Sequence, residues 1–297
     1  MKKIIFFLFL IYLPANSQIL KGIIIDSQTK EKLPYVNISL FNKNIGTSTN
    51  ENGYFKFEIS KKSSQDSLLI SFIGYKDKII PLKNYTSKIS NNIKIELEQK
   101  NELLNEVYIS DNKKNYSFIN HNLGTSRERT FIASVPYGDE IATLIENPRE
   151  KNGKLVELVL KFKKRSSDQI KVFKTYYRIN FYKNNLENGP GELLTYKNII
   201  IKPENKNNKV KLELKNLKIK LPKNGLYIGI EAINPQTNNP TSNLYLTTPN
   251  ILYTHDDKSL TYGRFRGGEW HEKKRKSVFK KNKFTVPLID LKVVYEK

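Results

Sequence analysis

The stretch that decides the fold runs from Gly22 to Ser110. It contains, in order, Gly22-Ile-Ile-Ile-Asp26, Leu33-Pro-Tyr-Val-Asn-Ile38, Gly46-Thr-Ser-Thr-Asn-Glu-Asn-Gly-Tyr-Phe55, Phe72-Ile-Gly-Tyr75 and Leu104-Asn-Glu-Val-Tyr-Ile-Ser110. Apolar residues in and around these stretches alternate with polar ones, as in Val36, Ile38 and Leu40, then Phe55, Phe57 and Ile59, then Ile93, Ile95 and Leu97. A period of two places each set on one face of a strand. Because Asn and Gly residues that favour tight turns separate the sets, the spacing predicts a small sandwich of about seven short strands.

The same ordered stretches resemble the carboxypeptidase regulatory-like domain of the Bacteroidetes type. The resemblance covers about the N-terminal third of the chain and implies a transthyretin-like β-sandwich at residues 18–98. Lys30 stands where members of that family usually have glycine after the first turn. The resemblance implies a fold and no catalytic residue.

The first 17 residues have the pattern of a secretory signal peptide. Lys2 and Lys3 provide the positive start, Ile4–Leu13 the apolar stretch, and Ala15-Asn16-Ser17 a small-residue cleavage site. The apolar stretch is shorter than the ~20 residues of a membrane-spanning helix. We therefore expect an exported protein that is periplasmic, associated with the outer membrane or displayed at the cell surface, with no transmembrane segment in the mature chain.

Residues 99–120 are rich in Asn, Lys and Glu, and we interpret them as a linker with one short strand at Leu104–Ser110. That strand resembles the segment that follows this domain in TonB-dependent outer-membrane receptors. Residues 121–297 alternate again and predict a second, larger β-sandwich, which makes the whole chain all-β. Arg178–Leu194 is similar to part of a jelly-roll-like sandwich, and Asp139–Ile145 is compatible with a helical turn or with a strand.

The chain is strongly basic, with a formal net charge of +22. In an exported protein we expect no nucleic-acid partner. The spread of Lys along the whole chain favours a compositional bias, and attraction to an anionic envelope component such as an acidic glycan or phospholipid headgroups is the functional alternative.

No catalytic motif is present, and we expect no cofactor and no metal site. The chain has no cysteine, and its histidines, His121, His255 and His271, do not form a zinc-binding motif. His255-Asp256-Asp257 is the densest metal-like cluster, and we interpret it as a surface loop. The sequence thus predicts a non-catalytic protein.

A single stretch combines side chains suited to binding. Tyr262-Gly-Arg-Phe-Arg-Gly-Gly-Glu-Trp270 contains the only tryptophan, two further aromatic residues, and Arg264 and Arg266. Aromatic rings beside arginine suit a sugar or a carboxylated glycan. Tyr262, Arg264, Phe265, Arg266 and Trp270 are therefore the candidate ligand-binding residues, and the structural alternative is a hairpin whose Trp270 caps the core.

Three functional classes remain open at this point. The first is an exported, non-catalytic accessory or binding protein that contacts carbohydrate or envelope proteins. The second is a glycan- or peptide-acting hydrolase with a site in the C-terminal sandwich, for which a cleft with two close carboxylates would be the sign. The third is a structural partner of an outer-membrane assembly.

Overall fold

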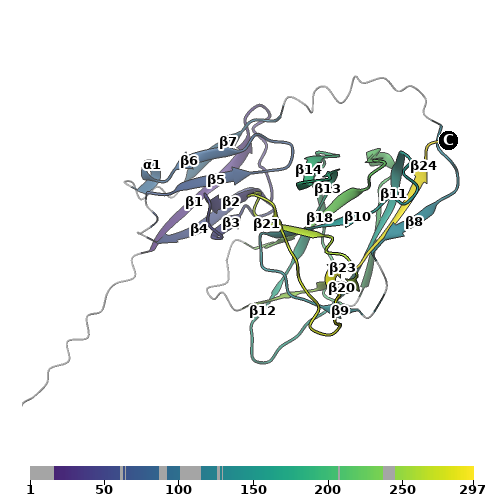
Figure 1. Ribbon diagram of the computed structural model, residues 1–297. Coiled ribbons are helices and arrows are strands. Elements are labelled where there is room, and N and C mark those ends of the chain that lie inside the picture. Colours follow the sequence, from purple (N-terminus) through teal and green to yellow (C-terminus); the bar gives the residue numbers. More distant parts are fainter. Residues whose placement is uncertain are drawn as a thin grey trace, which may run out of the picture.

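The computed structural model describes residues 17–60, 63, 65–86, 92–100, 115–125, 128, 130–206, 208–236 and 245–297. Residues 1–16 of the predicted leader and the Leu104–Ser110 stretch lie outside these ranges. Nearly all regular structure is β, apart from the short helix α1 (Lys83–Thr86) and a 3₁₀ turn at Lys215–Leu217 (Figure 1). In this part of the chain no helix is long and apolar enough to cross a membrane.

The N-terminal region is a sandwich of two sheets, as predicted. In the first sheet β1 lies between β4 and β7, antiparallel to β4 and parallel to β7. The second sheet has the order β3-β2-β5-β6 and is antiparallel throughout. The strands are β1 (Ser17–Asp26), β2 (Asn37–Leu40), β3 (Gly46–Ser48), β4 (Tyr54–Ser60), β5 (Ser67–Ser71), β6 (Lys78–Pro81) and β7 (Ile93–Leu97).

Two residues of the deciding stretch show why their identity matters. A Cβ atom on Gly22 would lie 2.1 Å from the carbonyl oxygen of Ile93 on the parallel neighbour β7, so only glycine fits there. Asp26 ends β1, and its carboxylate accepts hydrogen bonds from the backbone N–H of Thr29 at 2.9 Å, from Tyr75 Oη at 2.8 Å and from Gln99 Nε2 at 2.7 Å. The aspartate therefore ties the first turn to Tyr75, which precedes β6, and to Gln99, which follows β7.

The C-terminal region is a larger sandwich. One sheet has the order β14-β13-β18-β10-β21-β22, with β15 also pairing with β13. Its strands are β10 (Asp139–Ile145), β13 (Tyr176–Asn185), β14 (Gly189–Leu193), β15 (Ile199–Ile201), β18 (Leu226–Ile233), β21 (Thr261–Phe265) and β22 (His271–Glu272).

The opposing sheet has the order β23-β20-β11-β24-β8, and a separate pair joins β12 to β19. β16 and β17 also pair with β11, and β9 with β20. The strands are β8 (His121–Gly124), β9 (Phe131–Ile132), β11 (Gly153–Lys163), β12 (Val172–Lys174), β16 (Asn208–Glu213), β17 (Lys220–Leu221), β19 (Leu246–Thr248), β20 (Asn250–Asp256), β23 (Phe284–Pro287) and β24 (Ile289–Tyr295).

Both sheets contribute to one core. Residues from β13 and β18 on one side pack against residues from β11, β20 and β24 on the other, which confirms a sandwich. The predicted alternation holds except at the start of β11, where the register shifts between Leu155 and Glu157. Because of this bulge, Leu155 packs into the main core cluster, whereas Val156 is buried but lies outside that cluster.

Two local predictions are settled by the structure. Asp139–Ile145 is the strand β10 and not a helical turn, since its alternating side chains are shared between the core and the outer face of the sheet. The surface-loop interpretation of His255 is wrong, because His255 is buried near the end of β20 with its ring 5.2 Å from that of Phe131.

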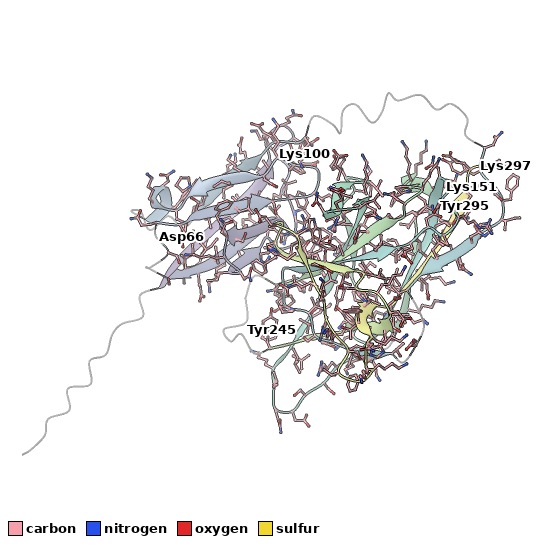
Figure 2. The ribbon with its side chains drawn as sticks, in the orientation of Figure 1. Asp66, Lys100, Lys151, Tyr245, Tyr295 and Lys297 are labelled. Carbon is pink, nitrogen blue, oxygen red and sulfur yellow. The ribbon has the colours of Figure 1, made fainter. Side chains whose placement is uncertain are left out.

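The two sandwiches lie against each other. The β3-β2-β5 side of the N-terminal sandwich faces β13, β18 and the end of β21, as Figure 1 shows. Figure 2 places Lys100 at the edge of the N-terminal sandwich, and Tyr295 and Lys297 at the far side of the C-terminal one.

Candidate binding face and domain interface

The candidate binding residues lie on and beside β21. Tyr262 and Arg264 are two residues apart on β21, so they share the outer face of the sheet, which faces away from the core. Gly263 and Phe265 alternate with them along β21, and they line a cleft that Arg264 also lines. Arg266 follows the end of β21 and has a positive φ of 45°, so alternation does not place it on that face. The structure thus brings Tyr262, Arg264 and Trp270 together, and it separates Phe265 and Arg266 from them.

Arg264 is held in a defined position by two groups of the same face. Its Nε donates to Glu140 Oε2 at 2.8 Å, and its Nη2 donates to Tyr182 Oη at 2.8 Å. Although burial lowers the pKa of Arg264, the charge of Glu140 and the phenol of Tyr182 raise it above its usual range. The guanidinium is therefore fully charged, while its side chain keeps 21% of its surface exposed. Within the described residues, Nη1 has no hydrogen-bond partner.

Glu140 is the hub of this arrangement. It is 2% exposed, and its Oε1 accepts hydrogen bonds from Asn180 Nδ2 and from Tyr182 Oη, each at 2.7 Å. Burial raises the pKa of Tyr182 well above its ordinary value, so this side chain is a neutral hydrogen-bond donor. Since Glu140 already accepts from three neighbours, it orients Arg264 and is not free to act on a ligand.

Trp270 completes the face. Its ring lies 4.3 Å from the Arg264 guanidinium carbon, in cation–π geometry, and 5.4 Å edge-on from the ring of Tyr182. Tyr262 packs edge-on against Tyr227 at 5.7 Å on the same face. Trp270 and Tyr262 are half-buried. The indole Nε1 of Trp270 has no hydrogen-bond partner in the described part of the chain.

Arg266 has a different environment from the one its sequence suggested. It is 3% exposed, and its Nη1 donates to Thr47 O at 2.7 Å and to Asn37 Oδ1 at 3.2 Å, both in the N-terminal sandwich. Burial lowers the pKa of Arg266 to about 10. Arg266 thus joins the two sandwiches and is not accessible to an external ligand.

A second arginine crosses the interface nearby. Arg178 and Glu231 are each 3% exposed, and Arg178 Nη1 lies 2.6 Å from Glu231 Oε2. Arg178 Nη2 donates to Tyr35 O, and Glu231 Oε1 accepts from Asn37 Nδ2 at 2.7 Å. Sequence reasoning missed this pair. The available signal was Glu231, the lone charged residue in the otherwise uncharged strand β18.

A cleft of about 520 Å³ runs along β21, and Arg264 is among the residues that line it. Its lining includes Asp139, Glu140, Phe265 and Glu272, together with several basic residues. Among these basic residues, Lys273 has the largest electrostatic effect on Asp139. Burial raises the pKa of Asp139, and the charges of Lys273 and Arg266 oppose that rise. Among the described residues no group of three or more His, Asp and Glu residues is placed to hold a metal ion.

Comparison with known proteins agrees with the N-terminal fold. Residues 20–109 match the family model of the CarboxypepD_reg-like domain, which extends past the boundary expected at residue 98. Backbone pairing also continues beyond that boundary, since the N–H of Lys100 donates to Gly74 O at 3.0 Å. No curated protein matches the chain. This domain type is a regulatory, non-catalytic fold. The N-terminal sandwich is a CarboxypepD_reg-like domain.

Proposed function

We propose that this protein is an exported, non-catalytic binding protein of the cell envelope, and that it holds carbohydrate on the outer face formed by Tyr262, Arg264 and Trp270. The observation that carries this proposal is the pairing of a fixed, charged guanidinium with a half-buried indole, each with an unused donor. The leader pattern in residues 1–17 supports export.

The chemistry of this face suits a sugar ring. The apolar face of a pyranose packs against an aromatic ring, while its hydroxyl or carboxylate oxygens accept hydrogen bonds from N–H donors. Arg264 Nη1 and Trp270 Nε1 are such donors. Because Glu140 and Tyr182 already hold Arg264, little side-chain freedom remains to be lost when a ligand binds.

The net charge of the chain favours an acidic sugar over a neutral one. A formal charge of +22 attracts an anionic ligand over a distance that salt shortens. A uronic-acid-containing oligosaccharide is therefore the first ligand class to test.

Intrinsic fluorescence gives a direct test, because Trp270 is the only tryptophan. We expect acidic oligosaccharides to change its emission in a saturable manner, and calorimetry to give affinities that fall with added salt. Trp270→Ala should weaken binding by about tenfold or more, since stacking and donor loss together exceed ~1.4 kcal/mol.

A matched control is Tyr54→Ala. Tyr54 is an aromatic residue, 47% exposed, that lies on the N-terminal sandwich. We expect this variant to bind like the unaltered protein. Equal losses in both variants, or no saturable signal with any acidic or neutral oligosaccharide, would rule out this face as a carbohydrate site.

A hydrolase is the second candidate, and the cleft beside β21 is the observation that favours it. The cleft carries Asp139 and Glu272, and burial raises the pKa of Asp139 as a general acid requires. Asp139→Asn should abolish any turnover of oligosaccharides or peptides if the cleft is catalytic. Binding without turnover in the unaltered protein supports the first proposal instead.

A further inference from the structure

The hairpin between β22 and β23 has an unusual composition at its tip. Residues 273–283 contain seven Lys and Arg residues and no Asp or Glu. In their middle, the side chains of Val278 and Phe279 are 87% and 58% exposed. Two large apolar side chains that are mostly exposed to water and surrounded by cations form an unusual surface for a folded domain.

Some of these cations are paired and others are not. Lys274 contacts Glu272 at 3.0 Å, Lys283 contacts Asp257 at 2.7 Å, and Lys280 and Lys283 share Glu128. In the part of the chain that the structure describes, Arg275, Lys276 and Lys281 have no carboxylate partner. The tip therefore presents uncompensated positive charge around its apolar pair.

The tip is held in one conformation. Ser277 Oγ accepts hydrogen bonds from the backbone N–H of Phe279 at 3.1 Å and of Lys280 at 3.0 Å, and the N–H of Ser277 donates to Lys283 O at 2.7 Å. Phe279 also packs edge-on against Phe131 of β9, with ring centroids 5.9 Å apart. The exposure of the apolar pair is thus built into the hairpin.

A groove of about 680 Å³ continues from the tip. Its apolar lining includes Phe131, Leu252, Val278 and Phe279, and its cations include Lys163 and Arg165 in addition to Arg275 and Lys276. None of the residues lining the groove is acidic. The groove repeats the composition of the tip, with apolar surface bordered by cations.

We propose that this hairpin docks the protein on a lipid bilayer that contains anionic phospholipids. Val278 and Phe279 enter the boundary between headgroups and acyl chains, and the surrounding Lys and Arg side chains contact lipid phosphates. A soluble polyanion would use the cations alone and leave the apolar pair in water. Both features are satisfied at once by a bilayer, where anionic headgroups lie directly above hydrocarbon.

The expected losses of vesicle affinity follow from the charge contribution and the apolar contribution of the hairpin. Each Lys or Arg near an anionic bilayer strengthens binding by about fivefold, so Lys276→Gln with Lys281→Gln should weaken it by about 25-fold. Burial of a Val or Phe side chain contributes at least about tenfold, so Val278→Ser with Phe279→Ser should weaken binding by about 100-fold. All four side chains are exposed, so neither variant should change the melting temperature by much.

The test is sedimentation of the full chain with vesicles. We expect binding to phosphatidylcholine vesicles that contain phosphatidylglycerol, weak binding to pure phosphatidylcholine, and release by salt. The apolar control is Leu186→Ser, since Leu186 is 78% exposed in the turn between β13 and β14. The charge control is Lys209→Gln with Lys211→Gln on β16, which pairs with β11 and not with the hairpin.

Several outcomes would overturn the proposal. They are equal affinity for both vesicle types, unchanged binding of the Val278→Ser, Phe279→Ser variant, or equal losses in the controls. If only the charge variant loses binding, the hairpin is a polyanion site and not a bilayer-docking site. Because the chain has no cysteine, Val278→Cys also provides a unique position for a polarity-sensitive dye, whose emission should shift to the blue on anionic vesicles.

Discussion

Replacing Arg178 by methionine tests how the two sandwiches are held together. The substitution removes the cation that lies 2.6 Å from the buried carboxylate of Glu231, and it removes the donor to Tyr35 O across the interface. Breaking a buried ion pair from one side costs about 3–5 kcal/mol, because the remaining charge is left without a partner. The ratio of folded to unfolded protein should therefore fall by about 150-fold to about 5,000-fold.

Removing both charges should do less harm than removing one. In the double variant Arg178→Met with Glu231→Met, both charges of the pair are gone, and apolar replacements of buried pairs are often neutral. The buried Arg266 loses the nearby charge of Glu231 but keeps its hydrogen bonds to Thr47 O and Asn37 Oδ1. We expect urea unfolding, followed by circular dichroism, to show a large decrease of the midpoint for Arg178→Met and recovery of most of it in the double variant. Hydrogen exchange should increase mainly around Tyr35 and Asn37, which face the altered site.

Lys183→Met on the same strand is the matched control. Lys183 lies 2.6 Å from Glu192, but the two side chains are 55% and 77% exposed, so we expect a loss below about 1 kcal/mol. The reasoning is refuted if Arg178→Met is as mild as Lys183→Met, or if the double variant is no more stable than the single one.

Three further predictions concern the N-terminal sandwich. Gly22→Ala should destabilise it by about 1–3 kcal/mol or more in thermal melts, because its Cβ would meet Ile93 O at 2.1 Å, whereas Gly191→Ala, with its closest contact at 3.4 Å, should not. Burial opposes ionisation of Asp26, but hydrogen bonds from Gln99, Thr29, Tyr75 and Gln28 outweigh it and lower the pKa of Asp26 from 3.8 to about 2. The resulting stabilisation is present above about pH 4 and is lost as pH falls towards 2. Thermal melts should therefore show this part of the acid destabilisation in the unaltered protein and not in Asp26→Asn. The fragment 18–109, which keeps the contacts of Gln99 and Lys100, should fold alone, with β-type circular dichroism and a cooperative melt, and an unfolded fragment would contradict an autonomous N-terminal domain.

The sandwich cores could be predicted because one property of the sequence decides them. Alternation assigns each apolar side chain to a face, and Phe55, Phe57 and Ile59 are each 3% exposed or less. Alternation breaks at the start of β11, where a bulge shifts the register between Leu155 and Glu157, and alternation alone contains no information on such a shift. The strand β10 was ambiguous because a short segment with few apolar residues fits both periods.

The site could be predicted only in part. The aromatic and arginine residues of the β21 region were evident as a group, and Arg264 and Trp270 are in contact. Arg266 lies past the end of β21, where its backbone has a φ of 45°, and the N-terminal sandwich covers it. Where a strand ends, and which side chain a distant segment covers, depend on tertiary packing, and periodicity within one strand does not encode them.

Tyr35 and Asn37 belong both to the stretch that marks the CarboxypepD_reg-like domain and to the surface that meets the C-terminal sandwich. The N-terminal sandwich is therefore not an interchangeable module. A chimaera that replaced residues 18–98 by another sandwich of the same fold would keep a hydrophobic core, but it would leave Arg178, Glu231 and Arg266 facing groups that do not match them. Successful exchange between relatives would require the receiving residues to be transplanted together with the module, and natural shuffling of this module is subject to the same constraint.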